Sequence, residues 1–212
     1  MTHAVLAEKT DSKIAIMPID ELKPHEKGSP VYLKLLRKEL LRDGMLRYPI
    51  VADEKTSVIL DGMHRWLALK SLGYTLIPVI LVNAIQNPKI RIGTRRIHRY
   101  MDDSPKITME KVISAALSGR LMKPRSTRHF FPFSKFQQIN CPLRSLGKKT
   151  PQDVSRYLAT MTATECNLAI EDWLDEISEE LKFLTKRKEE VEKEMGEFLN
   201  RVKNLDDGIS FF

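Results

Sequence analysis

Asp61-Gly62-Met63-His64-Arg65-Trp66 lies where a short apolar stretch gives way to a helical pattern, and this junction decides the fold. We expect a strand over residues 57–60, a turn at Asp61-Gly62 and a helix over residues 64–72. Gly62 lets the backbone approach a ligand closely, and the N–H groups and positive dipole of a helix start favour anions. An ordinary Asp-Gly turn before a capped helix explains these residues about as well.

The side chains at this turn suit a phosphate ligand. His64 and Arg65 can donate charge-assisted hydrogen bonds to phosphate oxygens. Asp61, at the end of the expected strand, is a candidate ligand for Mg²⁺ or an acceptor for a substrate donor.

Two further segments carry residue types that bind or transfer phosphate. The loop Lys123-Pro124-Arg125-Ser126-Thr127-Arg128-His129 offers cations and hydroxyls for phosphate oxygens. Such a run alone is slightly more often a solvated basic loop, but the following Phe130-Phe131-Pro132-Phe133 anchors it and makes free solvation less favoured. In Lys23-Pro24-His25-Glu26, the carboxylate of Glu26 can act as a general base. Taken alone, Glu26 is more commonly an acidic residue on the approach to a helix.

The surrounding segments predict a compact α+β domain. Ser29-Pro30 is typical of a helix start, and Asp43-Gly44 is typical of a helix end. Strands and helices that alternate irregularly favour a mixed sheet with helices packed against it. The expected strands cover residues 14–17, 48–52, 57–60, 77–82 and 89–97, and the expected helices cover residues 30–42, 64–72 and 108–117.

A different pattern begins at Thr162, which has capping-box spacing to Glu165. Apolar residues then recur at alternating intervals of three and four, with Lys188 as the polar member of the seam. This narrow stripe predicts a coiled-coil helix that needs a partner, either in a homodimer or in a helical hairpin. The seam consists of Ile170, Leu174, Ile177, Leu181, Leu184, Lys188, Val191, Met195, Phe198, Val202 and Leu205.

The net charge of +7 is unevenly distributed along the chain. Residues 164–212 contain 14 acidic and 7 basic side chains, whereas residues 1–163 contain 28 basic and 14 acidic side chains. The basic part suits an anionic partner, but charge alone does not distinguish a nucleotide from a nucleic-acid backbone.

The composition also bears on the compartment. No apolar run approaches the roughly 20 residues of a membrane-spanning helix, and we find no signal-peptide pattern. Cys141 and Cys166 are too few for a disulfide framework or a Cys-rich metal site. We therefore expect a cytoplasmic protein with no membrane partner.

Three motifs together resemble the free serine kinase branch of the ParB/sulfiredoxin superfamily. They are Lys23-Pro24-His25-Glu26, Asp61-Gly62-Met63-His64-Arg65, and Thr127-Arg128-His129 with Pro132, in the family's order. The Asp-Gly-X-His-Arg turn indicates only the superfamily, and the Thr-Arg-His loop points to the kinase branch. The resemblance covers roughly residues 14–133 and is interrupted in the middle.

The resemblance implies transfer of a phosphoryl group from ADP or ATP to the hydroxyl of free L-serine, with Mg²⁺ and O-phosphoserine as product. It makes Glu26 the base that takes the hydroxyl proton. It places Asp61, Gly62, Met63, His64 and Arg65 at the nucleotide phosphates, with Asp61 on the metal, and it closes Ser126, Thr127, Arg128 and His129 over the phosphates. Positioning and charge stabilisation of this kind dominate phosphoryl transfer.

The resemblance and the apolar stripe of the C-terminal segment together predict a domain layout. Residues 12–85 form a ParB/sulfiredoxin-like nucleotide-binding domain, residues 86–150 form a second lobe with the Thr-Arg-His loop, and residues 160–207 form the coiled-coil helix. Only about 45 residues separate Val82 from Thr127, so the second lobe is much reduced. The strand expected to supply an aromatic residue to the serine pocket reads Ile92-Gly93-Thr94-Arg95-Arg96, which leaves a similar small hydroxylated acceptor open. The resemblance does not predict the coiled-coil tail.

Three other functions can be set against this one. A sulfiredoxin needs a reactive cysteine before the His-Arg pair, and Met63 cannot do thiolate chemistry. A ParB-like regulatory protein that binds nucleotide and DNA would suit the basic part of the chain, although no helix-turn-helix follows the N-terminal domain clearly. A non-catalytic nucleotide sensor that signals through its coiled coil is the third.

Overall fold

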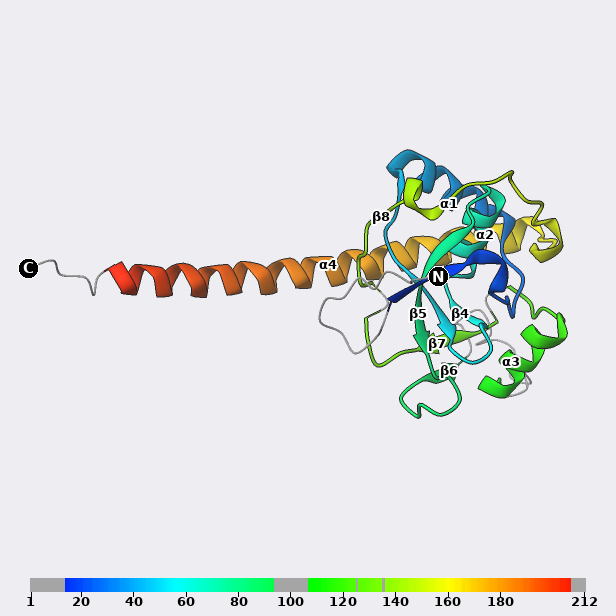
Figure 1. Ribbon diagram of the computed structural model, residues 1–212, viewed down its shortest axis with the longest axis horizontal. Coiled ribbons are helices and arrows are strands. Elements are labelled where there is room, and N and C mark those ends of the chain that lie inside the picture. The colour runs from blue at the N-terminus through cyan, green and yellow to red at the C-terminus, as the bar shows by residue number, and fades with distance from the viewer. Residues whose placement is uncertain (1–13, 94–106, 125, 135, 207–212) are drawn as a thin grey trace, which may run out of the picture. The chain divides into compact units, whose positions relative to one another are not determined.

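The computed structural model describes residues 14–93, 107–124, 126–134 and 136–206. The chain divides into two compact units, residues 1–170 and residues 171–212. The first unit holds the sheet and the shorter helices, and the second consists of most of the long helix α4 (Figure 1).

A four-stranded mixed sheet with the strand order β1-β5-β3-β4 forms the centre of the first unit. Strands β3 and β5 are parallel, and α2 lies between them in sequence as the crossover that parallel strands require. The other two pairings, β1 with β5 and β3 with β4, are antiparallel. The strands are β1 (Ile14–Pro18), β3 (Ile50–Asp53), β4 (Ile59–Asp61) and β5 (Leu76–Val82), and α2 is Met63–Ser71. The predicted α+β class with a mixed sheet is therefore confirmed.

Alternate residues of the sheet feed two hydrophobic clusters, because successive side chains of a strand point to opposite faces. One cluster contains Ile50, Ile77 and Val79 together with residues of α1 (Pro30–Asp43) and α2. The other contains Val51 and Ile80 together with one face of α3 (Met109–Ser118). The sheet is thus covered on one face by α1 and α2 and on the other by α3.

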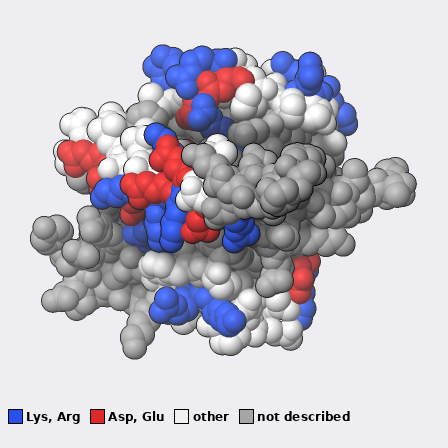
Figure 2. Space-filling view, turned by 90° about the vertical axis from the view of Figure 1, so that its left-hand side faces the viewer, with Lys and Arg blue, Asp and Glu red and all other residues white. Residues whose placement is uncertain are grey.

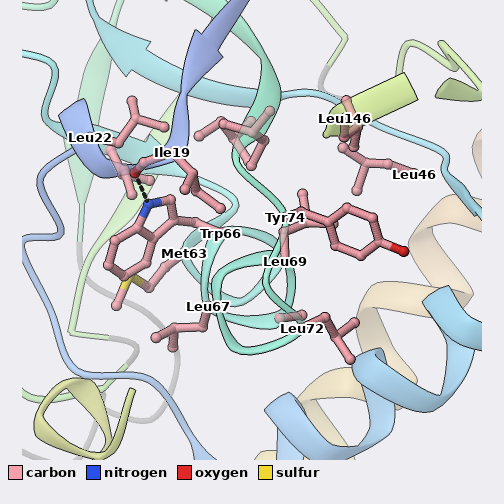
Figure 3. Close-up of a cluster of buried hydrophobic side chains, with 14 of the residues drawn as sticks. Ile19, Leu22, Leu46, Met63, Trp66, Leu67, Leu69, Leu72, Tyr74 and Leu146 are labelled. Carbon is pink, nitrogen blue, oxygen red and sulfur yellow. Dashed lines mark hydrogen bonds between the residues drawn. The ribbon is translucent and has the colours of Figure 1, made fainter. Parts of the chain in front are cut away.

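Trp66 is the largest fully buried side chain of the first cluster (Figure 3). Its indole Nε1–H donates a hydrogen bond of 2.8 Å to the carbonyl oxygen of Ile19, which satisfies the one polar atom of the ring. Trp66 is therefore a packing residue of the core.

The helix ends follow local sequence. The Ser29 hydroxyl accepts a hydrogen bond from the Tyr32 N–H at the start of α1, and Gly44 ends that helix in the left-handed conformation. Thr108 caps α3 in the same way, and Gly119 ends it. The remaining elements are the short strands β2 (Met45–Leu46), β6 (Arg91–Gly93), β7 (Arg128–Phe130) and β8 (Cys141–Pro142), and the 3₁₀ helices η1 (Ile19–Glu21), η3 (Leu143–Leu146) and η4 (Ser155–Tyr157).

Helix α4 (Ala163–Asp206) is one continuous helix of 44 residues. The predicted capping box is present: the Thr162 N–H donates to Glu165 Oε2 (2.8 Å), and the Glu165 N–H donates to Thr162 Oγ1 (3.2 Å). Val202 and Leu205 of the predicted seam lie outside the residues whose side chains are described. Pairing of this helix stays a prediction. Within the described part of the chain, no helix is long and apolar enough to cross a bilayer.

Candidate functional site

The segment that carries Glu26 is extended, and its backbone forms hydrogen bonds with three separate parts of the chain. Residue 23 pairs beside β4, residues 25–27 pair beside Met122, and residue 28 pairs beside residues 157–159. This fixes the backbone on both sides of Glu26. The hydrogen bonds are Lys23 N–H to Ser57 O (2.9 Å), Ile59 N–H to Lys23 O (2.9 Å), Met122 N–H to His25 O (2.9 Å), Lys27 N–H to Met122 O (2.9 Å) and Gly28 N–H to Tyr157 O (2.8 Å).

His25 is buried and contacts several other residues of the site. Its Nδ1 lies 2.7 Å from the carbonyl oxygen of Ile59, which can only accept, so Nδ1 carries the ring proton. Its Nε2 must then accept the hydrogen bond from the Thr127 hydroxyl at 2.8 Å. Burial lowers the pKa of His25 to about 4, against a smaller opposing effect of the bond to Ile59, so the ring is neutral at pH 7.

Glu26 lies beside this pair. The side chain is nearly buried, with 7% of the residue exposed. Its Oε2 is 3.4 Å from Thr127 Oγ1 and 3.9 Å from His25 Nε2. Thr127 has one hydroxyl proton for two acceptors, and the shorter contact goes to His25. Thr127 therefore touches both the ring of His25 and the carboxylate of Glu26.

The Thr-Arg-His loop reaches this point through strand β7, which pairs with β6 in register Ile92 to His129. The ring of His129 meets the ring of His25 edge to face, with centroids 5.5 Å apart, and stacks on Phe131 at 6.3 Å. The predicted anchoring of the loop by its aromatic residues is thus present in the structure. Arg125 lies outside the described residues.

Ser126, next to Thr127, has a buried hydroxyl whose oxygen makes no hydrogen bond with any residue that the structure describes. Leaving a buried hydroxyl unpaired costs free energy, and native proteins rarely do so without a functional reason. This oxygen is therefore available to a ligand of the loop.

Helix α2 begins directly after a glycine. Gly62 is its N-cap, with φ of 87°, and no side chain caps the first turn. A Cβ at Gly62 would lie 2.5 Å from Ile50 Cγ2, so glycine is required by both conformation and space. The N–H groups at a helix start point out of the helix, and this is the usual arrangement at an anion site. The Met63 side chain packs in the core, so only its backbone can meet a ligand there.

His64 links the first turns of α1 and α2. Its Nε2 accepts a hydrogen bond of 2.8 Å from the Ser29 N–H, and its ring lies against Tyr32 with centroids 4.5 Å apart. An Nε2 that accepts cannot carry a proton, so the ring is neutral and its proton is on Nδ1. A phosphate would meet a neutral donor here, in place of the cationic one suggested by the sequence.

Asp61 and Arg65 form an ion pair, with Oδ2 and Nη2 2.5 Å apart. Arg65 Nη1 also donates to the carbonyl oxygen of Pro49 at 2.5 Å, so this guanidinium holds Asp61 in place. Among the described residues, no group of three or more His, Cys, Asp or Glu side chains is placed to hold a metal ion. Mg²⁺ is commonly bound by one or two carboxylates together with substrate phosphates. Asp61 alone fits that donor set when a nucleotide supplies the rest.

The structure thus joins two of the three motifs directly, since Glu26 and His25 contact Thr127 and His129. The third motif is connected through His25 and Ile59, two residues before Asp61. His25 and Ser29 were not among the site residues expected from sequence. A histidine next to the expected base was the one indication for His25, and nothing indicated the contact between Ser29 and His64.

Comparisons with known proteins give several partial matches in sequence. The chain is 32% identical over 81 residues to the ATP-dependent L-serine kinase of Staphylothermus marinus, a match that covers 36% of this chain and 32% of the relative. It is 28% identical over 76 residues to the ATP-dependent L-serine kinase SbnI of Staphylococcus aureus (34% and 30% covered). It is 40% identical over 65 residues to a ParB-like protein of Sulfolobus acidocaldarius (30% and 31% covered). The chain therefore spans about a third of the length of these relatives. No protein-family model matches it.

Solved structures resemble the chain over a larger part. A free serine kinase in complex with AMP superimposes with a TM-score of 0.56 at 15% identity, covering 68% of this chain and 97% of that one. The chain has the free serine kinase fold. A glutamate-to-alanine variant of a free serine kinase in complex with ADP matches with a TM-score of 0.55 at 14% identity, covering 68% and 97%. A conserved hypothetical protein from Pyrococcus furiosus also matches, with a TM-score of 0.56 at 15% identity. The resemblance inferred from the three motifs is confirmed.

Proposed function

We propose that this protein transfers a phosphoryl group from ADP or ATP to the hydroxyl of free L-serine, or of a similar small hydroxylated metabolite. The observation that carries the proposal is the contact of Glu26 and Thr127 around the neutral ring of His25. It brings the expected base and the expected phosphate loop together from positions 101 residues apart. The sequence likeness to L-serine kinases and the shared fold support the same reaction.

In this mechanism the carboxylate of Glu26 accepts the proton of the acceptor hydroxyl. The hydroxyl oxygen forms a bond to the terminal phosphorus of the nucleotide, and the bond from that phosphorus to the leaving phosphate oxygen breaks. The products are the phosphorylated acceptor and AMP or ADP. A nearly buried carboxylate on a backbone that is hydrogen-bonded on both sides is well held for this task.

The phosphates would lie against two sets of donors. One is the first turn of α2, where Gly62 lets the backbone approach closely, together with the ring of His64. The other is the Thr-Arg-His loop, in which Ser126, Thr127, Arg128 and His129 are the expected ligands. Mg²⁺ on Asp61 would supply positive charge to the phosphate oxygens, while Arg65 holds the Asp61 carboxylate.

The test is a transfer assay with the purified full chain, Mg²⁺ and either ADP or ATP. Free L-serine and a panel of small hydroxylated acceptors are supplied, and products are identified by ³¹P NMR and mass spectrometry. We expect O-phosphoserine, or another phosphorylated acceptor, with AMP or ADP as co-product, and no product when Mg²⁺ is omitted.

The variant Glu26→Gln tests the role of the base. It should lower kcat by about 10²- to 10⁴-fold while nucleotide affinity is retained. Glu21→Gln, at an exposed glutamate in the adjacent η1, is the matched control and should leave kcat unchanged. Equal activity of Glu26→Gln and the parent would rule out this role for Glu26.

A ParB-like protein that binds nucleotide and DNA is the second candidate, supported by the match to a ParB-like protein and by the basic charge of residues 1–163. Figure 2 shows lysine and arginine side chains at several places on one face of the molecule, with acidic side chains among some of them. Tight nucleotide binding without transfer to any acceptor, together with salt-dependent DNA binding, would favour this candidate.

A further inference from the structure

Helix α4 carries an apolar seam along its described length that the helix itself cannot cover. Leu174 is 54% exposed, Leu181 59%, Met195 59% and Phe198 65%. Because α4 is uninterrupted from Ala163 to Asp206, the seam is not folded back on itself in a hairpin. An apolar stripe of this width is typical of a helix that pairs with another helix.

The heptad positions follow from the spacing. With Leu174, Leu181, Lys188 and Met195 at position a, the d positions are Ile177, Leu184, Val191 and Phe198. The g positions, which border the seam on one side, are then Glu180, Arg187, Glu194 and Arg201. Their charges alternate strictly along the helix.

We propose that α4 pairs with the α4 helix of a second copy of this chain, and that the two helices are antiparallel. In the register that we infer, Leu181 lies opposite the partner's Phe198, and Leu184 lies opposite the partner's Met195. Lys188 lies opposite the partner's Val191. The two-fold axis passes between residues 189 and 190.

The alternating charges select this register. In an antiparallel pair, g positions of one helix face g positions of the other. Here Glu180 meets the partner's Arg201, and Arg187 meets the partner's Glu194, and two-fold symmetry repeats each pair. A shift by one heptad in either direction brings glutamate to glutamate and arginine to arginine, which is repulsive.

The seam lysine argues against the parallel arrangement. Parallel pairing in register would place Lys188 against the partner's Lys188 in the middle of the interface. The g positions would then face e positions: Arg187 and Arg201 would meet the partner's Glu192 and Asp206, but Glu180 and Glu194 would meet only the uncharged Thr185 and Leu199. In the antiparallel register the stem of Lys188 covers the partner's Val191, while its ammonium stays near Glu192 of its own helix, 3.5 Å away.

Disulfide cross-linking of the full chain tests the orientation. Cys141 and Cys166 are first replaced by serine, and Leu181→Cys and Phe198→Cys are introduced in separate samples. Mixed under oxidising conditions, the two variants should form a cross-linked dimer. Leu181→Cys alone should not, because its two copies would lie on the order of 25 Å apart along the axis. Lys186→Cys, an exposed residue off the seam, controls for random collision.

Charge reversal tests the register. Arg187→Glu should weaken dimerisation about tenfold in analytical ultracentrifugation. Adding Glu194→Arg should restore it, whereas adding Glu192→Arg should not. Self-linking of Leu181→Cys, or rescue by Glu192→Arg in place of Glu194→Arg, would show a parallel pair and overturn the proposal. A protein that stays monomeric at every concentration tested would overturn it as well. None of these readouts depends on phosphoryl transfer.

Discussion

His25 Nε2 and Thr127 Oγ1 lie 2.8 Å apart, although 102 residues separate them in sequence. The bond from His25 Nδ1 to the Ile59 carbonyl sets the tautomer of the ring, so the Thr127 hydroxyl has to donate to Nε2. The segment that carries Glu26 and the loop that is expected to close over the phosphates are therefore held by one another. A substitution in the Glu26 segment should therefore affect the Thr127 loop, and a substitution in the loop should affect the segment.

Thr127→Val is the direct test of this link, because it keeps the shape of the side chain and removes the hydroxyl. The buried Nε2 of His25 loses its donor, which should lower the free energy of unfolding by about 1–3 kcal/mol. Activity in the transfer assay should fall by at least about tenfold, since Glu26 loses a neighbour that helps to hold it. Thr127→Ser keeps the hydroxyl and should retain most of both properties. Equal losses in the two variants would contradict the hydrogen-bond role.

The depressed pKa of His25 predicts how stability changes with pH. The pKa is about 4 in the folded protein against 6.5 as the ordinary value, so the unfolded chain binds more protons between these limits. The stability that the fold gains by holding His25 neutral is fully present above pH 6.5. It is lost as the pH falls toward 4, and the free energy of unfolding then decreases by about 3 kcal/mol in total. Urea unfolding at several pH values should show this slope.

His25→Gln is the matched variant for the pH experiment, because glutamine offers donors and an acceptor but does not titrate in this range. Its stability should vary less between about pH 4.5 and 6.5 than that of the parent. The same slope in both proteins would show that His25 does not carry the effect.

The helices were largely predictable from the sequence, because glycine and proline mark their ends. The expected helix at residues 30–42 is observed at Pro30–Asp43, with Gly44 in the left-handed conformation that a helix stop requires. The expected helix at residues 64–72 is observed at Met63–Ser71. These features depend on interactions within a few residues, which a local pattern records.

The pairings between distant segments were not predictable. No strand or short helix was expected in residues 122–150, yet β8 pairs with β2, and Leu143 and Leu146 are buried in the core. Strands of two or three residues are too short to show periodicity, so their partners cannot be inferred. The role of His25 was not predictable either, because it comes from contacts with Ile59 and Thr127, which are distant in sequence. Its burial also depends on the complete fold.

Gly62→Ala tests whether the start of α2 must have its present backbone path. At φ of 87° an alanine is strained, and its Cβ would lie 2.5 Å from Ile50 Cγ2. Gly44→Ala is the control, since Gly44 has φ of 65° but a Cβ there would have no neighbouring atom within 4 Å. The control should cost about 1–2 kcal/mol of stability. Gly62→Ala should cost at least about 1 kcal/mol more and weaken nucleotide binding, as measured by calorimetry. Equal costs would show that the contact with Ile50 is unimportant.

Ser126→Ala separates a ligand role from a structural one, because the two roles predict opposite signs. Its buried hydroxyl has no partner among the described residues, so removing it should raise the free energy of unfolding without nucleotide by about 1 kcal/mol. If the hydroxyl meets a phosphate, the same variant should bind ADP about tenfold more weakly and show a smaller thermal shift with it.

Ser71→Ala is the matched control, since the buried Ser71 hydroxyl donates to the Ala68 carbonyl at 2.9 Å. That variant should lose stability and keep its nucleotide affinity. Unchanged ADP affinity in Ser126→Ala would remove Ser126 from the site while leaving Glu26 and Thr127 in it.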